Sequence, residues 1–353
     1  MASAGAPFDA VLFLSFGGPD KPADVRPFLE NVTRGRGVPP ERLDDVAQHY
    51  LHFGGVSPIN RLNLDMIDAL RAELDSRGRD GLPIYFGNRN WHPLAGDTLA
   101  EMIADGHRRI LVFPTSAWGG YSGCRQYHED IEKALGSVDG LPADVVLRKL
   151  PQFSEETEFR GAVADAVRVG LARFADGPVP RLVFTAHSIP ESADRAAGPA
   201  ADGGRLYSRQ VRAASAAVAG LVGVDEFDVV WQSRSGPPQV PWLDPDICDH
   251  LRALHADGVQ RVAVCPIGFV SDHLEVVWDL DSEAADLAEE LGMDYVRVAT
   301  AGPSRRFVAL VADLVERYVD GGGDLTAMGC GDNGGICRPD CCVPVRRPAS
   351  TRV

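Results

Sequence analysis

The sequence contains no hydrophobic stretch that approaches the roughly 20 residues of a membrane-spanning helix. It also lacks an excess of positive charge, because 35 Lys and Arg stand against 50 Asp and Glu, giving a net charge of -15. Nucleic acid and anionic lipid are polyanions, so this charge excludes them as partners. With 45% hydrophobic and 24% charged residues, the composition predicts a soluble globular protein with one large domain or two ordinary ones.

The N-terminal region lacks the basic residues of a secretory signal. No Lys or Arg precedes the apolar run Val11–Phe16, and that run is too short for the core of a signal peptide. We therefore expect a cytoplasmic protein, in a compartment where thiols stay reduced.

The last stretch of the chain has few apolar side chains but four of the seven cysteines, Cys330, Cys337, Cys341 and Cys342. Such a segment cannot fold by burying a core, and clustered thiolates suggest a metal. The spacing differs from the paired Cys-x2-Cys knuckles of structural zinc and from the commonest ferredoxin patterns. An iron-sulfur cluster, zinc, disulfides and a tail without metal all stay open at this point.

Short apolar runs alternate with stretches of helical periodicity, which is typical of an α/β fold with mainly parallel sheets. The predicted buried strands are Phe8–Phe16, Leu82–Gly87, Arg109–Pro114, Val145–Leu150, Leu182–Ala186, Phe227–Gln232, Arg261–Pro266 and Tyr295–Val298. The clearest predicted helices are Pro58–Ser76, Glu155–Phe174, Leu206–Leu221 and Pro303–Tyr318.

Two segments share one pattern of helix end, Gly, strand and Pro: Ala104-Asp-Gly-His-Arg-Arg-Ile-Leu-Val-Phe-Pro114 and Ala256-Asp-Gly-Val-Gln-Arg-Val-Ala-Val-Cys-Pro266. A chance match at a common strand-helix junction is the alternative to a duplication. A duplication predicts two similar Rossmann-like halves with an active-site cleft between them, where the carboxyl ends of both sets of strands meet. We expect the first half at residues 1–150, the second at 151–320 and a cysteine-rich tail at 321–353, with the chain free to cross between halves.

An acidic stripe follows the second of these segments. Ser271 is placed to cap a helix on which Glu275, Asp279 and Glu283 stand four residues apart, and this spacing puts three carboxylates on one face. Like charges at this spacing destabilise a helix, so a solvated helix face is the simpler interpretation and a functional site the sharper one.

A histidine stands at another strand end. In Phe184-Thr-Ala-His-Ser-Ile-Pro190, His187 lies where a strand opens into a loop, the usual place for active-site groups in open α/β sheets. An isolated histidine there is more often a structural hydrogen-bonding group. Next to carboxylates, however, a neutral imidazole suits ferrous iron and can also accept a proton.

Several segments together resemble ferrochelatases, in order, from about Phe8 to Tyr318. They are Phe53-Gly-Gly-Val-Ser-Pro-Ile59, Phe184-Thr-Ala-His-Ser-Ile-Pro190, Gln232-Ser-Arg-Ser-Gly236 with Pro241-Trp242, and Pro266-Ile-Gly-Phe-Val-Ser-Asp-His-Leu-Glu275. Tyr85-Phe-Gly-Asn-Arg-Asn-Trp91 and Trp118-Gly-Gly-Tyr-Ser-Gly-Cys124 resemble the actinobacterial branch most. The resemblance implies the class II chelatase fold and a lyase that inserts ferrous iron into a porphyrin for haem biosynthesis, releasing two protons.

The resemblance also implies roles for the residues already singled out. His187 and Glu275 match the metal-binding pair, with His187 a candidate proton acceptor, and Asp279 and Glu283 extend a carboxylate track for iron or protons. Members of the actinobacterial branch carry a 2Fe-2S cluster. Its implied ligands here are Cys124, Cys330, Cys337 and Cys342, with Cys341 as the alternative to Cys342. Cys248 and Cys265 are expected to be ordinary buried thiols.

Porphyrin contacts carry over from the resemblance to Ser57, Tyr127, Tyr50 and Arg34, of which Arg34, with Arg36 in the same Thr33-Arg-Gly-Arg36 segment, suits a propionate. Phe16 stands where relatives from other Gram-positive bacteria have a Tyr that can ligate the product iron. Phe16 offers no oxygen for that role.

The branch resembled implies coproporphyrin III as substrate, with protoporphyrin IX as the alternative. Another class II tetrapyrrole chelatase is a rival interpretation, although paired histidines would be expected where this chain has His187 and Glu275. A non-enzymatic iron-sulfur or haem carrier is a rival of another class. Transient contact with neighbouring enzymes of the haem pathway is also expected.

Overall fold

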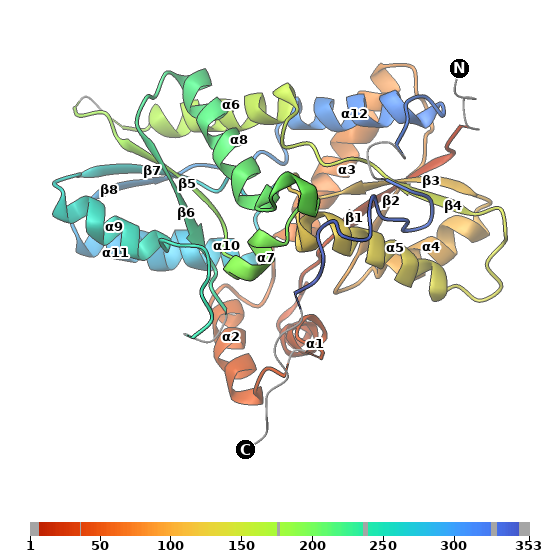
Figure 1. Ribbon diagram of the computed structural model, residues 1–353, viewed down its shortest axis with the longest axis horizontal. Coiled ribbons are helices and arrows are strands. Elements are labelled where there is room, and N and C mark those ends of the chain that lie inside the picture. Colours follow the sequence, from red (N-terminus) through yellow and green to blue (C-terminus); the bar gives the residue numbers. More distant parts are fainter. Residues whose placement is uncertain (1–6, 36, 175–176, 236–238, 326–329, 346–353) are drawn as a thin grey trace.

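The computed structural model describes residues 7–35, 37–174, 177–235, 239–325 and 330–345. Its centre is formed by two four-stranded sheets that lie side by side (Figure 1). The first sheet contains β1 (Ala10–Ser15), β2 (Ile84–Asn88), β3 (Arg109–Pro114) and β4 (Val146–Lys149). The second contains β5 (Arg181–His187), β6 (Phe227–Gln232), β7 (Arg261–Cys265) and β8 (Asp294–Arg297).

The two sheets have the same topology. The strand orders are β2-β1-β3-β4 and β6-β5-β7-β8, and all neighbouring strands are parallel. The repeated sequence segments form β3 and β7, which occupy equivalent third places. The eight predicted strands and the two similar halves are therefore confirmed.

The strands are buried because helices cover the sheets. All six residues of β1 are buried, as its continuous apolar run predicts for a parallel strand covered on both faces. The long helices are α3 (Ile59–Ser76), α6 (Thr157–Leu171), α8 (Leu206–Val222) and α12 (Arg305–Val319), close to the predicted bounds. The other helices that cover the sheets are α4 (Ala95–Ala104), α5 (Gln126–Gly136), α9 (Ile247–Ala256) and α11 (Ala284–Glu290).

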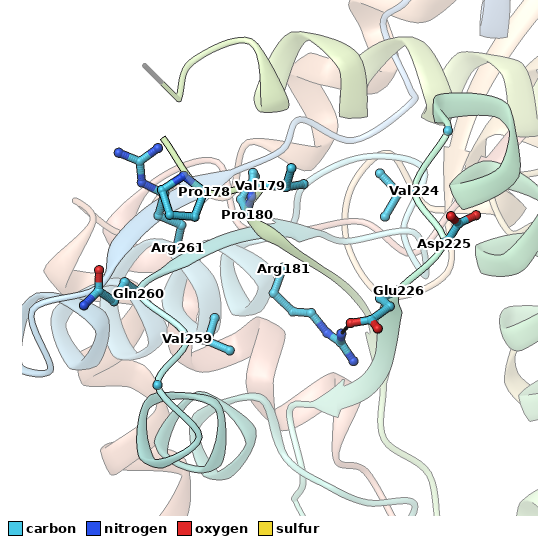
Figure 2. A pocket seen from close by; sticks show the side chains of 12 residues that line it. Pro178, Val179, Pro180, Arg181, Val224, Asp225, Glu226, Val259, Gln260 and Arg261 are labelled. Atoms are coloured by element: carbon cyan, nitrogen blue, oxygen red, sulfur yellow. Dashed lines mark hydrogen bonds and ion pairs between the residues drawn. The ribbon is translucent and has the colours of Figure 1, made fainter. Parts of the chain in front are cut away.

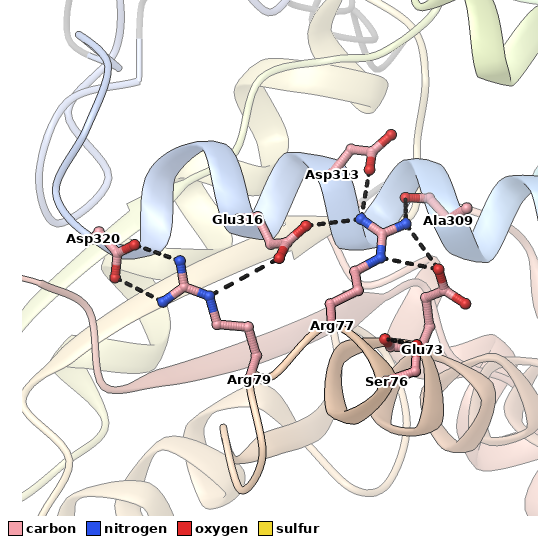
Figure 3. Close-up of polar contacts among 8 residues, drawn as sticks. All are labelled: Glu73, Ser76, Arg77, Arg79, Ala309, Asp313, Glu316 and Asp320. Carbon is pink, nitrogen blue, oxygen red and sulfur yellow. Dashed lines mark hydrogen bonds and ion pairs between the residues drawn. The ribbon is translucent and has the colours of Figure 1, made fainter.

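Helix α12 connects the two halves. It packs against α3, which lies beside the first sheet, and against α6, which lies beside the second (Figure 1). Figure 3 shows Arg77, at the end of α3, reaching Asp313 and Glu316 of α12 at 2.6 and 2.8 Å. Arg79 pairs with Asp320 just beyond α12. One cluster of buried side chains also contains residues of both sheets, such as Phe113 and Phe184. The division at residues 150 and 320 stays a prediction.

Helices α1 (Pro22–Val32) and α2 (Pro40–His52) form a separate pair that projects beyond the sheets between the two halves (Figure 1). Their apolar faces pack in one cluster that includes Phe28 and Tyr50, together with Leu274 from the second half. We call this helix pair the cap.

The prediction for the start of the acidic helix was wrong. Ser271 does not cap it, because its hydroxyl lies 3.3 Å from Asn63 Oδ1, and the helix α10 begins only at Leu274. After Val277 the chain continues as a π-helical segment, Trp278–Glu283, before α11. The wider π-helical turn depends on packing around it, which helical periodicity in the sequence does not reveal.

Candidate functional site

The segments that follow the strands of both sheets meet. Asn63 of α3 donates a hydrogen bond to Ser15 Oγ at the end of β1 (2.7 Å) and accepts one from Ser271, which follows β7 (3.3 Å). Trp118, after β3, donates through its indole N–H to the Gly268 carbonyl (2.9 Å). These contacts bring the carboxyl ends of the two sheets together, where ligands bind in open α/β sheets. They support the predicted location of the site.

His187 is the last residue of β5 and is half-buried at this junction. Its Nδ1 contacts the Ser188 carbonyl, and its own carbonyl accepts a 2.8 Å hydrogen bond from the Tyr207 hydroxyl. If Nδ1 carries the proton and donates to that carbonyl, Nε2 is left with a lone pair for a metal or a proton.

His273, just before α10, lies within electrostatic reach of His187. Burial lowers the pKa of His273, Glu275 opposes this shift, and His187 adds to it. The His273 ring also packs near Phe16 and Phe269, with ring centroids 6.5 and 5.1 Å away. Sequence reasoning did not give His273 a role. The signal was present in Ser-Asp-His-Leu-Glu275, because β5 and β7 are adjacent strands and their carboxyl ends lie side by side.

The acidic residues come together along α10 and the π-helical segment. The Asp279 carboxylate accepts hydrogen bonds from Gln232 (3.0 Å) and Ser233 at the end of β6. Burial raises the pKa of Asp279 to about 7; Ser233 and Gln232 oppose the shift, while Glu275 and Glu283 add to it. Glu275 is half-buried and Glu283 is exposed. The stripe therefore runs from the histidines to solvent and is more than a solvated face.

The cap packs on this stripe. His49 of α2 stacks on Trp278 with ring centroids 3.9 Å apart and planes 5° apart, and His52 meets the same indole edge-on at 5.7 Å. Burial lowers the pKa of His49, against the opposing effect of Glu283. Burial, and to a smaller extent Glu275, raise the pKa of Tyr50 well above its usual value. The predicted porphyrin contact Tyr50 thus lies near the predicted metal ligand Glu275.

The other predicted porphyrin residues occupy different surroundings. Ser57 is buried against Gly18, where an added Cβ would stand 2.6 Å from the Ser57 Cβ. Arg34 is exposed just beyond α1, and Arg36 lies outside the described residues. Tyr127 is buried among the side chains beneath α4 and α5, with its hydroxyl 3.3 Å from Thr115 Oγ1 and the Arg89 guanidinium 4.6 Å from its ring centroid.

The tail brings its cysteines toward Cys124, which lies in a π-helical turn, Tyr121–Arg125, before α5. Burial raises the pKa of Cys124 to about 11, Lys149 opposes the shift, and three tail thiols add to it. Those thiols belong to Cys342, Cys330 and Cys337. The Cys341 and Cys342 sulfurs are 3.7 Å apart. Cys265 is fully buried on β7 and Cys248 half-buried on α9, and burial raises both pKa values to about 12.

The tail is attached to both halves. Asn333 forms a two-way pairing with Leu147 of β4, since its main-chain N–H donates to the Leu147 carbonyl and its side chain accepts from the Leu147 N–H, each at 2.8 Å. Cys342 accepts a hydrogen bond at Sγ from the N–H of Gly198, which follows α7 (Glu191–Arg195) in the second half (3.3 Å). Within the described residues, no group of three or more His, Cys, Asp or Glu has the arrangement for a single metal ion.

Two surface hollows lie away from this junction. One, of about 420 Å³, is lined by the segments that precede β5, β6 and β7, at residues 178–181, 223–226 and 258–261 (Figure 2). The other, of about 350 Å³, lies near the start of β1. Both are at the amino ends of the strands, opposite the histidines and the acidic stripe. Chemistry rather than hollow size therefore identifies the candidate site.

Comparison with known proteins agrees with the geometry. The ferrochelatase family model matches residues 8–319. The chain belongs to the ferrochelatase family. Family members similar to it include the coproporphyrin III ferrochelatases of Nocardia farcinica, Mycobacteroides abscessus and Corynebacterium glutamicum, at 59%, 55% and 53% identity. The matches cover 97%, 95% and 95% of this chain and 98%, 98% and 92% of those relatives.

The fold of this ferrochelatase family member is also similar to a solved class II chelatase. The sirohydrochlorin chelatase SirB from Bacillus subtilis subspecies spizizenii, in complex with cobalt, aligns with a TM-score of 0.51 at 10% identity. The alignment covers 88% of this chain and 95% of that chain. At this identity the likeness concerns the fold alone. Within the part of the chain described, no helix has the length and apolar character needed to cross a membrane.

Proposed function

We propose that this chain inserts ferrous iron into coproporphyrin III, a step of haem biosynthesis that forms Fe-coproporphyrin and releases two protons. The observation that carries the proposal is the similarity to a relative named coproporphyrin III ferrochelatase. The two chains are 59% identical, and the match covers 98% of the relative's length. The convergence of His187, His273 and Glu275 at the carboxyl ends of the strands supports the same chemistry.

In the proposed mechanism, His187 and Glu275 bind the Fe²⁺ substrate. An imidazole and a carboxylate suit this ion, and a pair of ligands leaves room for the porphyrin nitrogens to take over coordination. Once the iron has passed to the porphyrin nitrogens, the freed Nε2 lone pair of His187 accepts a pyrrole proton. The half-buried aromatic side chains of Phe16 and Phe269, which pack beside His273, would provide apolar walls against which a flat macrocycle is held and distorted.

The acidic stripe provides the path for iron or protons. Asp279, with a pKa of about 7, can both accept and release a proton at neutral pH, whereas an ordinary aspartate cannot. It stands between Glu275 and the exposed Glu283, and both of these carboxylates act on its pKa. We infer that protons leave, or iron enters, along these three residues.

Ser57, Tyr127, Tyr50 and Arg34 are the proposed porphyrin contacts. Arg34 is exposed and suits a propionate. Coproporphyrin III has four propionates and protoporphyrin IX has two, so their relative rates test this assignment. Axial ligation of the product iron by a phenol oxygen is excluded at Phe16, whose ring faces His273.

The deciding experiment is an anaerobic Fe²⁺ insertion assay that compares coproporphyrin III with protoporphyrin IX on the purified full chain. We expect faster metallation of coproporphyrin III. Equal or faster metallation of protoporphyrin IX would show that the substrate assignment is wrong, and no metallation of either would contradict the enzyme assignment and favour a carrier.

A chelatase for another metal and another tetrapyrrole is the second candidate function. The fold similarity to SirB and the presence of a second histidine, His273, favour it. The same assay with Co²⁺ and Ni²⁺ and with a sirohydrochlorin-type macrocycle tests it. We expect Fe²⁺ with coproporphyrin III to give the highest rate. A higher rate for another pair would favour the rival chelatase.

We also propose that the tail cysteines and Cys124 hold a 2Fe-2S cluster. A two-iron cluster takes four cysteines, two on each iron, so its needs differ from those of a single ion with three or more ligands. Four thiols that interact across the first half and the tail fit this requirement. When bound, the cluster would tie the tail to the first half; metal insertion involves no net electron transfer and needs no redox step from it.

The fourth ligand in this proposal is Cys342 rather than Cys341. Cys342 interacts with Cys124 and its sulfur accepts the Gly198 N–H, a type of contact that Fe–S ligands commonly make. Its φ of +52° is in the left-handed region and sets the direction of its side chain. We expect Cys342→Ser to lose the visible absorption of the cluster and Cys341→Ser to retain it. The reverse result would assign Cys341, and a colourless wild type with stoichiometric zinc would rule out the cluster.

We place the protein in the cytoplasm. The proposed cluster needs reduced cysteines as ligands, and such thiols persist in a reducing compartment. Fractionation of the native cells would test this location.

A further inference from the structure

A lysine is buried beneath the cysteines. Lys149, the last residue of β4, has no solvent exposure and is among the largest fully buried side chains of the described chain. Lysines are almost never fully buried unless they are paired, because an ammonium group loses its hydration when it leaves water. The neighbouring Arg148 pairs with Asp332 at the surface. Lys149 therefore needs an anion in the interior.

The oxygen partners of Lys149 are neutral. Its Nζ donates to the Leu150 carbonyl (2.9 Å) and to Gln152 Oε1 (2.8 Å). Gln152 in turn donates to the Gly123 carbonyl (2.6 Å), next to Cys124. These bonds fix the ammonium position but leave its charge uncompensated by oxygen acceptors.

Two cysteines interact with this lysine, one in the first half and one in the tail. Its ammonium forms a hydrogen bond with the thiol of Cys330 and interacts electrostatically with that of Cys124. Thiolates at these positions are the anions that would pair with the buried charge. A cluster held by four thiolates carries net negative charge, and hydrogen bonds and charges around the sulfurs set its reduction potential.

We propose that Lys149 is the buried counter-cation of the tail cluster, fixed by Gln152 between Cys124 and Cys330, and that it raises the reduction potential of the cluster and favours its binding. This inference rests on the proposed cluster. It gives Lys149 a positioning and charge-balancing role that is separate from iron insertion at His187.

The test compares Lys149→Gln, which removes the charge but retains a donor, with Lys149→Arg, which retains the charge. Lys133→Gln is the matched control, because it removes the same charge from the exposed face of α5. The readouts are visible absorption, iron and sulfide content, and the reduction potential from an anaerobic redox titration of the full chain. We expect Lys149→Gln to lower the reduced-to-oxidised ratio at a fixed potential at least tenfold, about 59 mV for one electron.

Lys133→Gln is expected to leave the potential unchanged and Lys149→Arg to keep it near the wild-type value. If Lys149→Gln folds without cluster while Lys149→Arg binds it, the charge requirement is supported as well. An unchanged potential in Lys149→Gln, or equal loss of cluster in both Lys149 variants, would overturn the proposal in favour of packing. A colourless wild type would instead remove the cluster itself, which distinguishes failure of that proposal from failure of the lysine's role.

Discussion

His187 ends β5 and His273 lies in the segment after the adjacent strand β7, within electrostatic reach of His187. Burial and the nearby His187 lower the pKa of His273, while Glu275 opposes this shift, so a proton is disfavoured on His273. His273 is therefore favoured as a neutral imidazole beside the proposed iron-binding pair His187 and Glu275.

Replacement of His187 by Ala is expected to reduce iron insertion by at least about 100-fold, because the proposed iron ligand and proton acceptor is removed. The anaerobic insertion assay measures this loss. The visible absorption of the proposed tail cluster should stay at the wild-type level, since Cys124 and the tail lie away from His187. Insertion at the normal rate would show that the mechanism is wrong.

Asp279→Asn is expected to change how stability depends on pH. The folded protein holds a proton on Asp279 more tightly than the unfolded chain, so stability from this group is present below about pH 4 and is lost as the pH rises through about 7. The Asn variant cannot ionise and still accepts the Gln232 and Ser233 hydrogen bonds. We expect it to be about 1–3 kcal/mol more stable than wild type at pH 8.5 and equally stable near pH 4.

Unfolding curves monitored by circular dichroism without added Fe²⁺ measure this difference. The matched control is Glu283→Gln, which removes an exposed carboxylate of the same stripe. A stability gain for Asp279→Asn that is equal at both pH values would contradict the assigned pKa.

Arg77→Ala is expected to weaken the attachment of α12 to α3. The Arg77 guanidinium forms ion pairs with Glu73, Asp313 and Glu316 and is only partly exposed. Its loss should therefore lower the free energy of unfolding by about 1–2 kcal/mol. Arg61→Ala is the control, because Arg61 pairs with Asp65 within α3 at the surface and should cost less than about 0.5 kcal/mol. Equal effects in urea unfolding would mean that the network adds nothing across the helices.

Gly334→Ala is expected to detach the tail. Gly334 has a φ of +88°, and a Cβ there would stand 2.4 Å from Glu132 Cγ and 2.7 Å from the His128 carbonyl on α5. Either the turn or the contact with α5 must therefore give way. We expect lower iron content and weaker visible absorption. Gly136→Ala on α5 is the control, because a Cβ there meets no atom within 4 Å, and it should retain the wild-type iron content and visible absorption. Equal iron content in the two variants would contradict the docking of the tail on α5.

Strand positions could be predicted because burial on both faces leaves continuous apolar runs, as in β1 and β7. The repeat could be recognised in the sequence because a Gly shortly before each strand and a Pro at its end are local features. His187 was found from its place at a strand end. The role of Ser271 was not predictable, since its hydroxyl bonds to Asn63 on a distant helix instead of capping its own.

The missed features depend on tertiary packing. The π-helical segment keeps Trp278 against His49 of the cap, a contact between distant parts of the chain. His273 was missed because it comes within electrostatic reach of His187 only in the folded chain. Lys149 lies in Val-Leu-Arg-Lys-Leu150, where nothing in the sequence shows that the lysine faces inward. Cys342 differs from Cys341 through the Gly198 N–H, which comes from the other half.

The pairing of Asn333 with Leu147 also affects whether the protein self-associates when its tail is detached. β4 is one of the two outer strands of the first sheet, and backbone groups left free there would offer a template for another chain. Asn333 pairs with the N–H and carbonyl of Leu147 on this strand, with a further hydrogen bond to the Val145 carbonyl just before it (3.2 Å). Loss of the tail therefore exposes β4 as an unpaired edge strand. We expect protein without the tail to self-associate through this edge while its two halves are still folded.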